Sequence, residues 1–325
     1  MGSPPSTEKA KVSVCLITGG AGNLACQLSW FLQDRFKRIL LFDRARAPTG
    51  KISPISQFVQ GDLLNEHQIV ELFEEHKPTA VIHLASLLSG SCEQDRSLAW
   101  KVNMDGTFSL LETALQNGKP KVLFASSVAA FSGRLPDVLT DDTPQWPETL
   151  YGVTKMAVER LGCYYQKRHG LDFRCIRLPI TISRHAPRGA ASALASHAFI
   201  EAVHSGKFVF AARLETKLAA IYVRDVLRAF ADLLSASEAT LTRRVYNIGG
   251  FTTTPREIAA AIKCRLPKAV MEFCPDDAVD SVLAAWPSAI DDSAARHDWQ
   301  WRTEWNIDRT ADDFLTLLKA ETDAK

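Results

Sequence analysis

The stretch from residue 11 to residue 32 constrains the fold more than any other part of the chain. Residues 11–18 (KVSVCLIT) form a short apolar run with the length of a buried parallel strand. A glycine-rich turn over residues 19–22 follows, and residues 23–32 place apolar side chains at helical spacing. Strand, tight glycine turn and helix in this order predict a phosphate cradle. Gly19 permits the sharp turn, Gly22 lets a pyrophosphate approach the backbone, and the helix N-terminus supplies N–H donors.

A second strand ending in an acidic residue supports this interpretation. Arg38–Asp43 is an apolar run that ends in Asp43, about twenty residues after the glycine turn. A carboxylate at this position accepts both hydroxyls of an adenosine ribose but repels a 2′-phosphate, so the sequence predicts NAD rather than NADP as the cofactor. Arg44 and Arg46 stand beside Asp43 and leave the use of NADP open. The alternative is that these glycines form an ordinary turn and that Asp43 is an ordinary loop carboxylate. We favour the cofactor site because the glycine turn and the acidic strand end occur together.

The first half of the chain alternates between short apolar runs and helical patterns. This alternation predicts an α/β fold with a doubly wound parallel sheet, the Rossmann arrangement, and a smaller C-terminal substrate lobe. Ligands on such sheets bind at the carboxyl ends of the strands. The pattern breaks up after Pro179. We therefore expect a disordered tail over residues 1–10, an NAD-binding domain over 11–178, and mainly a substrate-binding lobe over 179–325, with some segments returning to the first domain.

Composition excludes several classes of protein. The 38 basic and 37 acidic residues give a net charge of +1 with no basic block, so we expect no nucleic-acid partner. No apolar run is long enough to cross a membrane, and no signal peptide is visible. The seven cysteines are scattered without metal-binding spacing, which is typical of reduced thiols, so we expect a cytoplasmic protein with no metal site. We also expect a homodimer.

A tyrosine and a lysine four residues apart carry the predicted chemistry. Tyr151 and Lys155 fall on one face of a predicted helix. A free tyrosine is a poor base at neutral pH, but a nearby lysine cation favours the phenolate and lowers its pKa. Ser127, at the end of the preceding strand, is placed to align a substrate oxygen with Tyr151. Such a pair is common on helix surfaces, and it becomes specific here because it follows the glycine turn, Asp43 and the Ser126–Ser127 strand end.

The chain resembles the extended short-chain dehydrogenase/reductase superfamily (the NAD-dependent epimerase/dehydratase family) along nearly its whole length. The matching motifs include Thr18–Gly22, Gly61–Leu63, His83–Ala85, Val102–Asn103 and Tyr151–Lys155. The resemblance implies Ser127, Tyr151 and Lys155 as the catalytic set. It also implies a set of cofactor-binding residues: Gly19, Gly22, Asn23, Leu24, Asp43, Asp62, Leu63, Leu84, Ala85, Ser86, Asn103, Tyr151, Lys155, Leu178 and Ile180.

Resemblances of individual segments point to enzymes that act on small hydroxy acids. Segments 151–155, 170–177 and 286–299 resemble the short-chain L-threonine 3-dehydrogenases, whereas 126–131 and 188–194 look more like D-erythronate dehydrogenase. Where the threonine enzymes carry a polar Gly-Gly-Gly-Thr-Thr-Asp-Tyr segment, this chain has alanines, with Ser192 as the remaining hydroxyl. A pocket of alanines does not satisfy an ammonium group, which favours a hydroxy acid. The implied substrate-binding residues are Ser89, Ser127, Tyr151, Arg184, Arg188, Ser192 and Trp286.

Each of three further features can be interpreted in two ways. His83 is either a packed core histidine, which we favour, or an acid–base group. Arg184, His185 and Arg188 form either a solvated basic loop or a clamp for a substrate carboxylate. Trp299, Trp301 and Trp305 are better explained by packing or an oligomer contact than by ligand stacking.

The sequence thus predicts an NAD-dependent dehydrogenase of a small hydroxy acid. The alternative is a nucleotide-sugar epimerase or dehydratase that keeps its NAD tightly bound. A cofactor-binding regulator without catalysis is a third hypothesis, against which the intact Ser127, Tyr151 and Lys155 argue.

Overall fold

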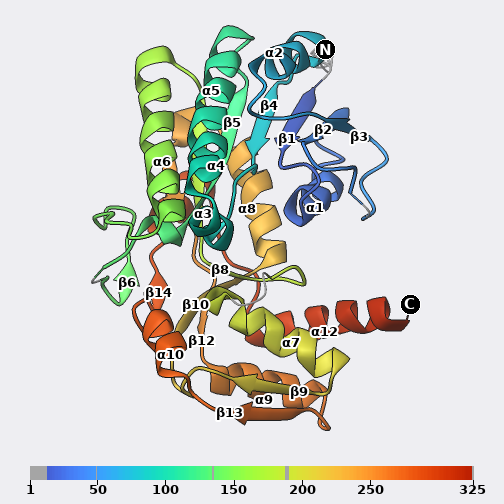
Figure 1. Ribbon diagram of the computed structural model, residues 1–325, viewed down its shortest axis with the longest axis vertical. Coiled ribbons are helices and arrows are strands. Elements are labelled where there is room, and N and C mark those ends of the chain that lie inside the picture. The colour runs from blue at the N-terminus through green and yellow to red at the C-terminus, as the bar shows by residue number, and fades with distance from the viewer. Residues whose placement is uncertain (1–12, 49, 134, 187–189, 324–325) are drawn as a thin grey trace, which may run out of the picture.

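A seven-stranded parallel sheet forms the centre of the upper part of the molecule (Figure 1). The structure is a computed structural model that describes residues 13–48, 50–133, 135–186 and 190–323. All neighbouring strands pair in parallel, which confirms the predicted doubly wound α/β fold. The strand order reverses between β1 and β4, so a crevice opens beyond their carboxyl ends. From one edge to the other the strands are β11 (Val245–Asn247), β7 (Phe173–Leu178), β5 (Lys121–Ser127), β4 (Ala80–His83), β1 (Val14–Thr18), β2 (Arg38–Asp43) and β3 (Ser56–Gln60).

Helices cover both faces of this sheet because its strands are apolar on both faces. Cys15 and Ile17 pack toward α1 (Asn23–Phe31) and α8 (Val223–Ser235). Val14 and Leu16 point the other way, toward α2 (Glu66–His76), α5 (Gly106–Gln116) and α6 (Leu150–His169). Alternate residues of one strand therefore serve two separate cores.

Capping residues set several helix ends as the sequence indicates. Asn65 caps α2 through a hydrogen bond from the Gln68 N–H. Thr149 caps α6, and Gly170 ends that helix in the left-handed conformation. Thr254 and Glu257 form a complete capping box at the start of α9 (Pro255–Arg265).

The helical stretch over residues 97–117 is divided into several pieces. It comprises α4 (Arg96–Trp100), a π-helical turn (Lys101–Asp105) and α5, and it is preceded by a separate short helix, α3 (Ser89–Gln94). Asp95 ends α3 and accepts a hydrogen bond from the Leu98 N–H, which starts the second helix. Side-chain bonds of Asn103 hold the π turn, so tertiary contacts override the continuous helical pattern.

The lower part has its own apolar core, built from small sheets and helices (Figure 1). Its strands β8, β10 and β12 are short, and residues 307–323 form the long helix α12. The elements are β8 (Ile180–Ile182), the 3₁₀ turn η3 (Ala191–Ala193), α7 (Leu194–His204), β9 (Lys207–Phe210), β10 (Leu218–Tyr222), β12 (Phe251–Thr253), α9, β13 (Val270–Phe273), α10 (Asp277–Ala284) and α12 (Ile307–Asp323).

A late segment of the chain returns to the sheet domain. β14 (Ala289–Ile290) pairs with β6 (Val138–Leu139), and α11 (Ser293–Trp299) follows. Trp299 and Trp301 join the core beneath α1 and α8, where Trp301 is completely buried. Trp305 lies against the ring of Tyr222, with centroids 4.9 Å apart. The three tryptophans therefore pack within the fold, as predicted. Among the described residues, no helix is both long and apolar enough to span a membrane.

Candidate active site

The glycine turn forms a tight cradle between β1 and α1. Gly19 has a φ of +71°, and a Cβ there would lie 2.9 Å from the Ala85 nitrogen, so a side chain at this position would be strained and crowded. The first turn of α1 has no side-chain cap and no acidic residue. Its N–H groups and its positive dipole end are thus free to meet an anion. These features fit the diphosphate of NAD.

Asp43 stands at the tip of β2, beside this cradle. Its carboxylate accepts hydrogen bonds from the Ala21 N–H at 3.1 Å and the Ala45 N–H at 2.9 Å. Both bonds orient the carboxylate, and each oxygen keeps a further lone pair for a ribose hydroxyl. The predicted NAD-binding acid therefore lies next to the predicted phosphate site.

His83 is a packed core histidine, as favoured from the sequence. Its ring nitrogens lie 2.6 Å from the Thr18 hydroxyl and 2.8 Å from the Thr107 hydroxyl. Burial, with a smaller contribution from Lys155, lowers the pKa of His83 to about 3, so the ring is neutral. Thr18 in turn accepts a bond from the Ala85 N–H, so His83 ties the ends of β1 and β4 to α5. Neither threonine was singled out from the sequence, because no local pattern links positions so far apart.

Asn103 uses its polar atoms within the protein. Its side-chain oxygen accepts from the Leu87 N–H at 2.8 Å, and its nitrogen donates to the Leu87 carbonyl and to the Thr154 hydroxyl. It therefore holds the loop after β4 against α6, next to Lys155. Leu63 is also engaged, because it is buried against Gly106 in the core. Direct contact of either residue with a cofactor remains a prediction.

The three predicted catalytic residues come together where β5 meets α6. Ser127 ends β5, where its hydroxyl lowers the pKa of the neighbouring Tyr151 and accepts a hydrogen bond from the Ala129 N–H at 3.1 Å. α6 approaches the turn η2 (Val128–Ala130) closely, since a Cβ on Gly152 would lie 2.1 Å from the Ala129 carbonyl oxygen. The fold thereby brings the hydroxyls of Ser127 and Tyr151 together at the carboxyl end of the sheet.

Burial governs the electrostatics of this pair. It raises the pKa of Tyr151 to about 12, and the Ser127 hydrogen bond offsets only part of that effect. Burial also lowers the pKa of Lys155 to about 8. The Lys155 ammonium donates to the Ala125 carbonyl at 2.8 Å and lies 5.3 Å from the centroid of the Tyr151 ring. Burial therefore dominates the pKa of Tyr151, and the effect of Lys155 on it stays a prediction.

A buried ionic network supports the catalytic strand and helix from behind. Glu159, one helical turn after Lys155, accepts from the Ser126 hydroxyl at 2.5 Å and forms a salt bridge with Arg177 at 2.8 Å. Gln145 also donates to Glu159. This network joins β5, α6 and β7 directly below Ser127. Sequence reasoning missed Glu159, although its four-residue spacing from Lys155 was a usable signal.

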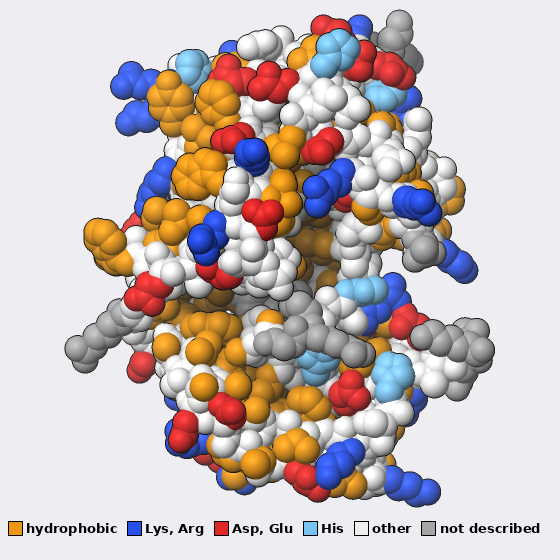
Figure 2. Space-filling model, viewed as in Figure 1, with side chains coloured by type: hydrophobic (Ala, Val, Ile, Leu, Met, Phe, Trp, Pro, Cys, Tyr) orange, Lys and Arg blue, Asp and Glu red, His pale blue; other side chains and the backbone are white. Residues whose placement is uncertain are grey.

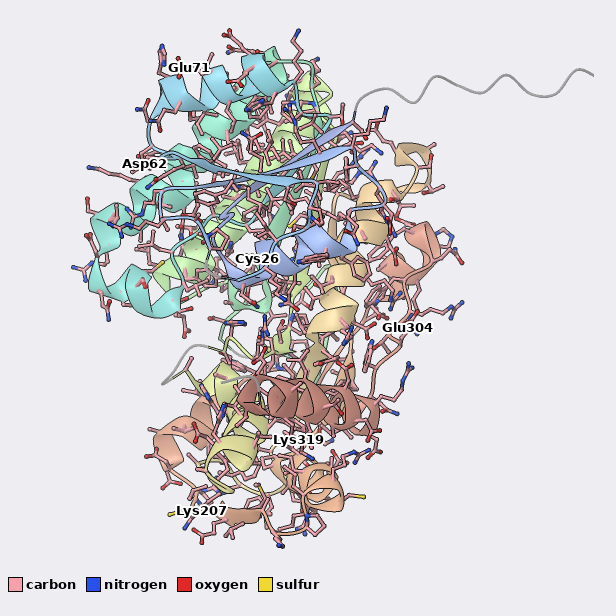
Figure 3. The ribbon with its side chains drawn as sticks, turned by 90° about the vertical axis from the view of Figure 1, so that its right-hand side faces the viewer. Cys26, Asp62, Glu71, Lys207, Glu304 and Lys319 are labelled. Carbon is pink, nitrogen blue, oxygen red and sulfur yellow. The ribbon has the colours of Figure 1, made fainter. Side chains whose placement is uncertain are left out.

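The remaining predicted cofactor residues lie at or beyond the carboxyl ends of the sheet strands. Figure 2 shows the surface hollowed between the two parts of the molecule. Asp62 follows β3, with Leu64 N–H bonded to its carboxylate at 2.9 Å; Figure 3 labels it. Ser86 donates to Asn103 in the loop after β4. Leu178 ends β7 and Ile180 begins β8, so both lie where the chain passes from the sheet to the lower part. The other positions are Gly22, Asn23 and Leu24 at the start of α1, and Leu84 and Ala85 beyond β4.

The predicted substrate residues come from both parts of the molecule. Ser89 is exposed at the start of α3, and Ser192 lies in η3, which contacts α10. Trp286 follows α10 and is half-buried against the lower core.

Arg184 is exposed and forms an ion pair with Glu321. Arg188 lies outside the described residues. Of the alanine-rich segment, Ala193 and Leu194 are buried in the core.

Comparison with known proteins identifies the family to which this chain belongs. Residues 15–249 match the family described as "NAD dependent epimerase/dehydratase family". The chain belongs to this family. The mitochondrial L-threonine 3-dehydrogenase of Bos taurus is 33% identical over 320 residues, which cover 98% of this chain and 86% of the relative.

Solved structures of L-threonine dehydrogenases have a similar fold. L-threonine dehydrogenase from Clostridium difficile superposes with a TM-score of 0.89 at 30% identity, covering 95% of this chain and 98% of that one. The enzyme from Phytophthora infestans gives 0.87 at 34% identity, covering 95% and 100%. The chain is an NAD-dependent short-chain dehydrogenase acting on a CH–OH group, and its cofactor is NAD.

Proposed function

We propose that the protein oxidises the alcohol of a small hydroxy acid, with Tyr151 as the general base. The observation that carries this proposal is the close approach of α6 to the turn that follows Ser127, which sets Tyr151 beside the carboxyl end of β5. In this arrangement the Ser127 hydroxyl holds the substrate oxygen, and the Tyr151 oxygen receives its proton. NAD supplies the hydride acceptor when bound.

Lys155 has a positioning and electrostatic role in this scheme. Its ammonium is held by the Ala125 carbonyl and points along the same helix face as Tyr151. From that place it is expected to bind the nicotinamide ribose. The raised pKa of Tyr151 requires additional positive charge before the phenol becomes a workable base, and bound oxidised cofactor brings that charge next to it.

The substrate preference rests on the polar groups near the site. Ala190, Ala191 and Ser192 offer one hydroxyl where the threonine enzymes carry several polar side chains. Such a surface suits the hydroxyls of a three- to six-carbon, D-erythronate-like acid better than the ammonium group of L-threonine. Ser89 and Ser192 would bind the substrate, with Trp286 beside them.

Steady-state kinetics test this proposal. NAD is supplied with a panel of hydroxy acids and with L-threonine, and NADH formation is followed by its absorbance. We expect a higher kcat/KM for a hydroxy acid. A higher kcat/KM for L-threonine would overturn the substrate assignment and leave the dehydrogenase activity intact. Turnover of a nucleotide sugar without accumulation of NADH would instead support the epimerase or dehydratase alternative.

Assembly and location stay predictions. A homodimer is tested by light scattering, and a cytoplasmic location by fractionation of cells that express the protein. The bovine relative is described as mitochondrial, so fractionation should include mitochondria.

A further inference from the structure

The last three residues of β5 extend beyond the neighbouring strand β4. The pairing of β5 with β4 ends at Phe124, opposite His83, whereas its pairing with β7 continues to Ser127, opposite Leu178. Ser127, whose hydroxyl holds the substrate oxygen in the proposed function, is therefore the last residue of a strand end that the sheet supports through β7. Such a strand end needs further contacts if its side chains are to keep one orientation.

Helix α6 supplies these contacts from two consecutive turns. Lys155 Nζ donates to the Ala125 carbonyl at 2.8 Å, and one turn later Glu159 Oε1 accepts from the Ser126 hydroxyl at 2.5 Å. Lys155 is expected to bind the nicotinamide ribose, so its ammonium is shared with the cofactor. Glu159, in contrast, is buried away from solvent. The bond between Ser126 and Glu159 is therefore the contact that is independent of the cofactor.

The Glu159 carboxylate is itself held firmly. Its two oxygens accept from Nε and Nη2 of Arg177 at 3.0 and 2.8 Å, and Gln145 donates to Oε2 at 2.8 Å. Arg177 stands directly opposite Ser126 in the ladder between β5 and β7. With the bond from Ser126, four donated hydrogen bonds define the position of both oxygens. The carboxylate thus joins two neighbouring strands to the helix that carries Tyr151.

Stability alone does not explain a charged pair at this place. Glu159 and Arg177 are only 1% and 3% exposed, and burying both charges costs free energy that well-packed apolar side chains would not cost. A bidentate pair does fix orientation more narrowly than apolar packing, because its hydrogen bonds are directional. The buried pair is therefore better explained by a role in orienting the residues that it contacts.

We propose that Ser126 and Glu159 are positioning residues of the dehydrogenase reaction. Their hydrogen bond fixes the end of β5, and through it the orientation of the adjacent Ser127 hydroxyl toward the substrate oxygen. In this role neither Ser126 nor Glu159 contacts the substrate or the cofactor. The positioning role rests on the proposed function, because it acts through Ser127.

Ser126→Ala tests the positioning role without breaking the buried ion pair. It removes one hydroxyl and leaves the hydrogen bonds between Glu159 and Arg177, so the variant should fold. We expect kcat with the fastest substrate of the panel to fall about tenfold, because a small misplacement of a substrate-aligning group slows the chemical step. KM and the Kd for NAD should stay within about twofold of the wild type. Ser29→Ala is the matched control, since Ser29 is a completely buried serine of α1 with two hydrogen bonds of its own.

Glu159→Gln tests the other end of the bond. Its amide nitrogen would face the donors of Arg177 and Gln145, so the side chain must shift. We expect kcat to fall at least as far as in Ser126→Ala. In the double variant kcat should fall no further than in Glu159→Gln alone, because both changes break the same link. Steady-state kinetics and calorimetric titration with NAD measure these constants. Thermal unfolding verifies that each variant is folded, and Ser126→Ala decides the question if Glu159→Gln is not.

Ser127→Ala, measured alongside, distinguishes the positioning role from the proposed function. If Ser127→Ala keeps the activity of the wild type, the proposed role of Ser127 is wrong, and the positioning role is wrong with it. If Ser127→Ala is inactive while Ser126→Ala has the kcat of the wild type, only the positioning role is overturned. An equal loss of kcat in Ser29→Ala, or a loss in Ser126→Ala that is matched by rises in KM and in the Kd for NAD, would also overturn it, since either result indicates a general structural effect.

Discussion

Tyr151 and Lys155 share one helix face, and burial shifts the pKa of each in an unfavourable direction for base catalysis. The pKa of Tyr151 is about 12, where the phenol is a weak acid, and that of Lys155 is about 8, where the ammonium loses charge easily. Both effects have the same cause, since a poorly solvated site penalises any charged form. In the proposed mechanism, charge brought by the cofactor would therefore act together with Lys155.

The role of Tyr151 is tested by removing its hydroxyl. Tyr151→Phe deletes one oxygen, so we expect kcat to fall at least about a hundredfold while the Kd for NAD changes little. Tyr164→Phe is the control, because Tyr164 lies on the same helix with its side chain 52% exposed. Steady-state kinetics and NAD titration provide the two measurements. Activity close to that of the wild type in Tyr151→Phe would refute the general base.

Cofactor choice is a second property of a single side chain. Asp43→Ala removes the carboxylate that Ala21 and Ala45 orient. The ratio of kcat/KM for NAD to that for NADP should fall about tenfold, because the acceptor of the ribose hydroxyls and the repulsion of a 2′-phosphate are both lost. Initial rates with each cofactor measure the ratio. A wild-type protein that uses both cofactors equally would show that Asp43 does not select between them.

At the scale of elements, the position of α6 depends on how closely it approaches the sheet. Gly162 faces Phe173 of β7, and a Cβ at this position would lie 2.2 Å from the Phe173 ring. The same helix carries Tyr151, Lys155 and Glu159, so this contact helps to set the height of the catalytic groups above β5. Glu159 secures the arrangement through Ser126 and Arg177.

An alanine at this contact should push the helix away. Gly162→Ala is expected to destabilise the protein by about 2 kcal/mol, because overpacking outweighs the better helix propensity of alanine. Gly90→Ala is the control, since Gly90 lies in α3 with open space around its missing Cβ. Urea unfolding compares the two. Partial recovery in the double variant Gly162→Ala/Phe173→Leu would identify the ring as the obstacle, and equal stability of both single variants would contradict the argument.

At the scale of the whole molecule, the late chain segment is fastened to the sheet by polar anchors. Asp298 of α11 accepts hydrogen bonds from Thr242 and Tyr246 near β11, at 2.6–2.7 Å. Asp225 of α8 likewise accepts from Thr303, Glu304 and Trp305. These carboxylates fix the segment that leads from the sheet domain to α12.

The Asp298 anchor predicts a pH dependence of stability. Burial opposes ionisation, but hydrogen bonds from His297, Tyr246 and Thr242 outweigh it and lower the pKa of Asp298 to about 2, from an ordinary value of 3.8. A depressed folded-state pKa stabilises the protein above about pH 4, and this contribution is lost as the pH falls toward 2.

The corresponding variant is Asp298→Asn. It should lower the free energy of unfolding by about 2 kcal/mol at neutral pH, and the difference from the wild type should shrink as the pH falls from about 4 to 2. Urea unfolding across this range measures it. Asp291→Asn is the control, because Asp291 bonds only the neighbouring Ser293 through its carboxylate. A difference that does not depend on pH would contradict the linkage.

Local pattern determined much of this protein before any tertiary structure was considered. The order of strands and helices in the first half, the cradle at Gly19 and Gly22, the acid at Asp43 and the spacing of Tyr151 and Lys155 are all encoded within short segments. These features follow from the side-chain periods of strands and helices and from the backbone freedom of glycine, which need no distant partner. The central sheet was accordingly predicted correctly, whereas the helix around Asn103 is divided.

Only the tertiary structure decided which distant residues meet. It joined Thr18 to His83 and Thr107, divided the helix around Asn103, and set Arg184 against Glu321. It also set the burial of Tyr151, because the extent of burial depends on every element around the site. The physical reason is the same in each case: periodicity and propensity act over a few residues, whereas desolvation and ion pairing depend on distances that only the packed chain defines.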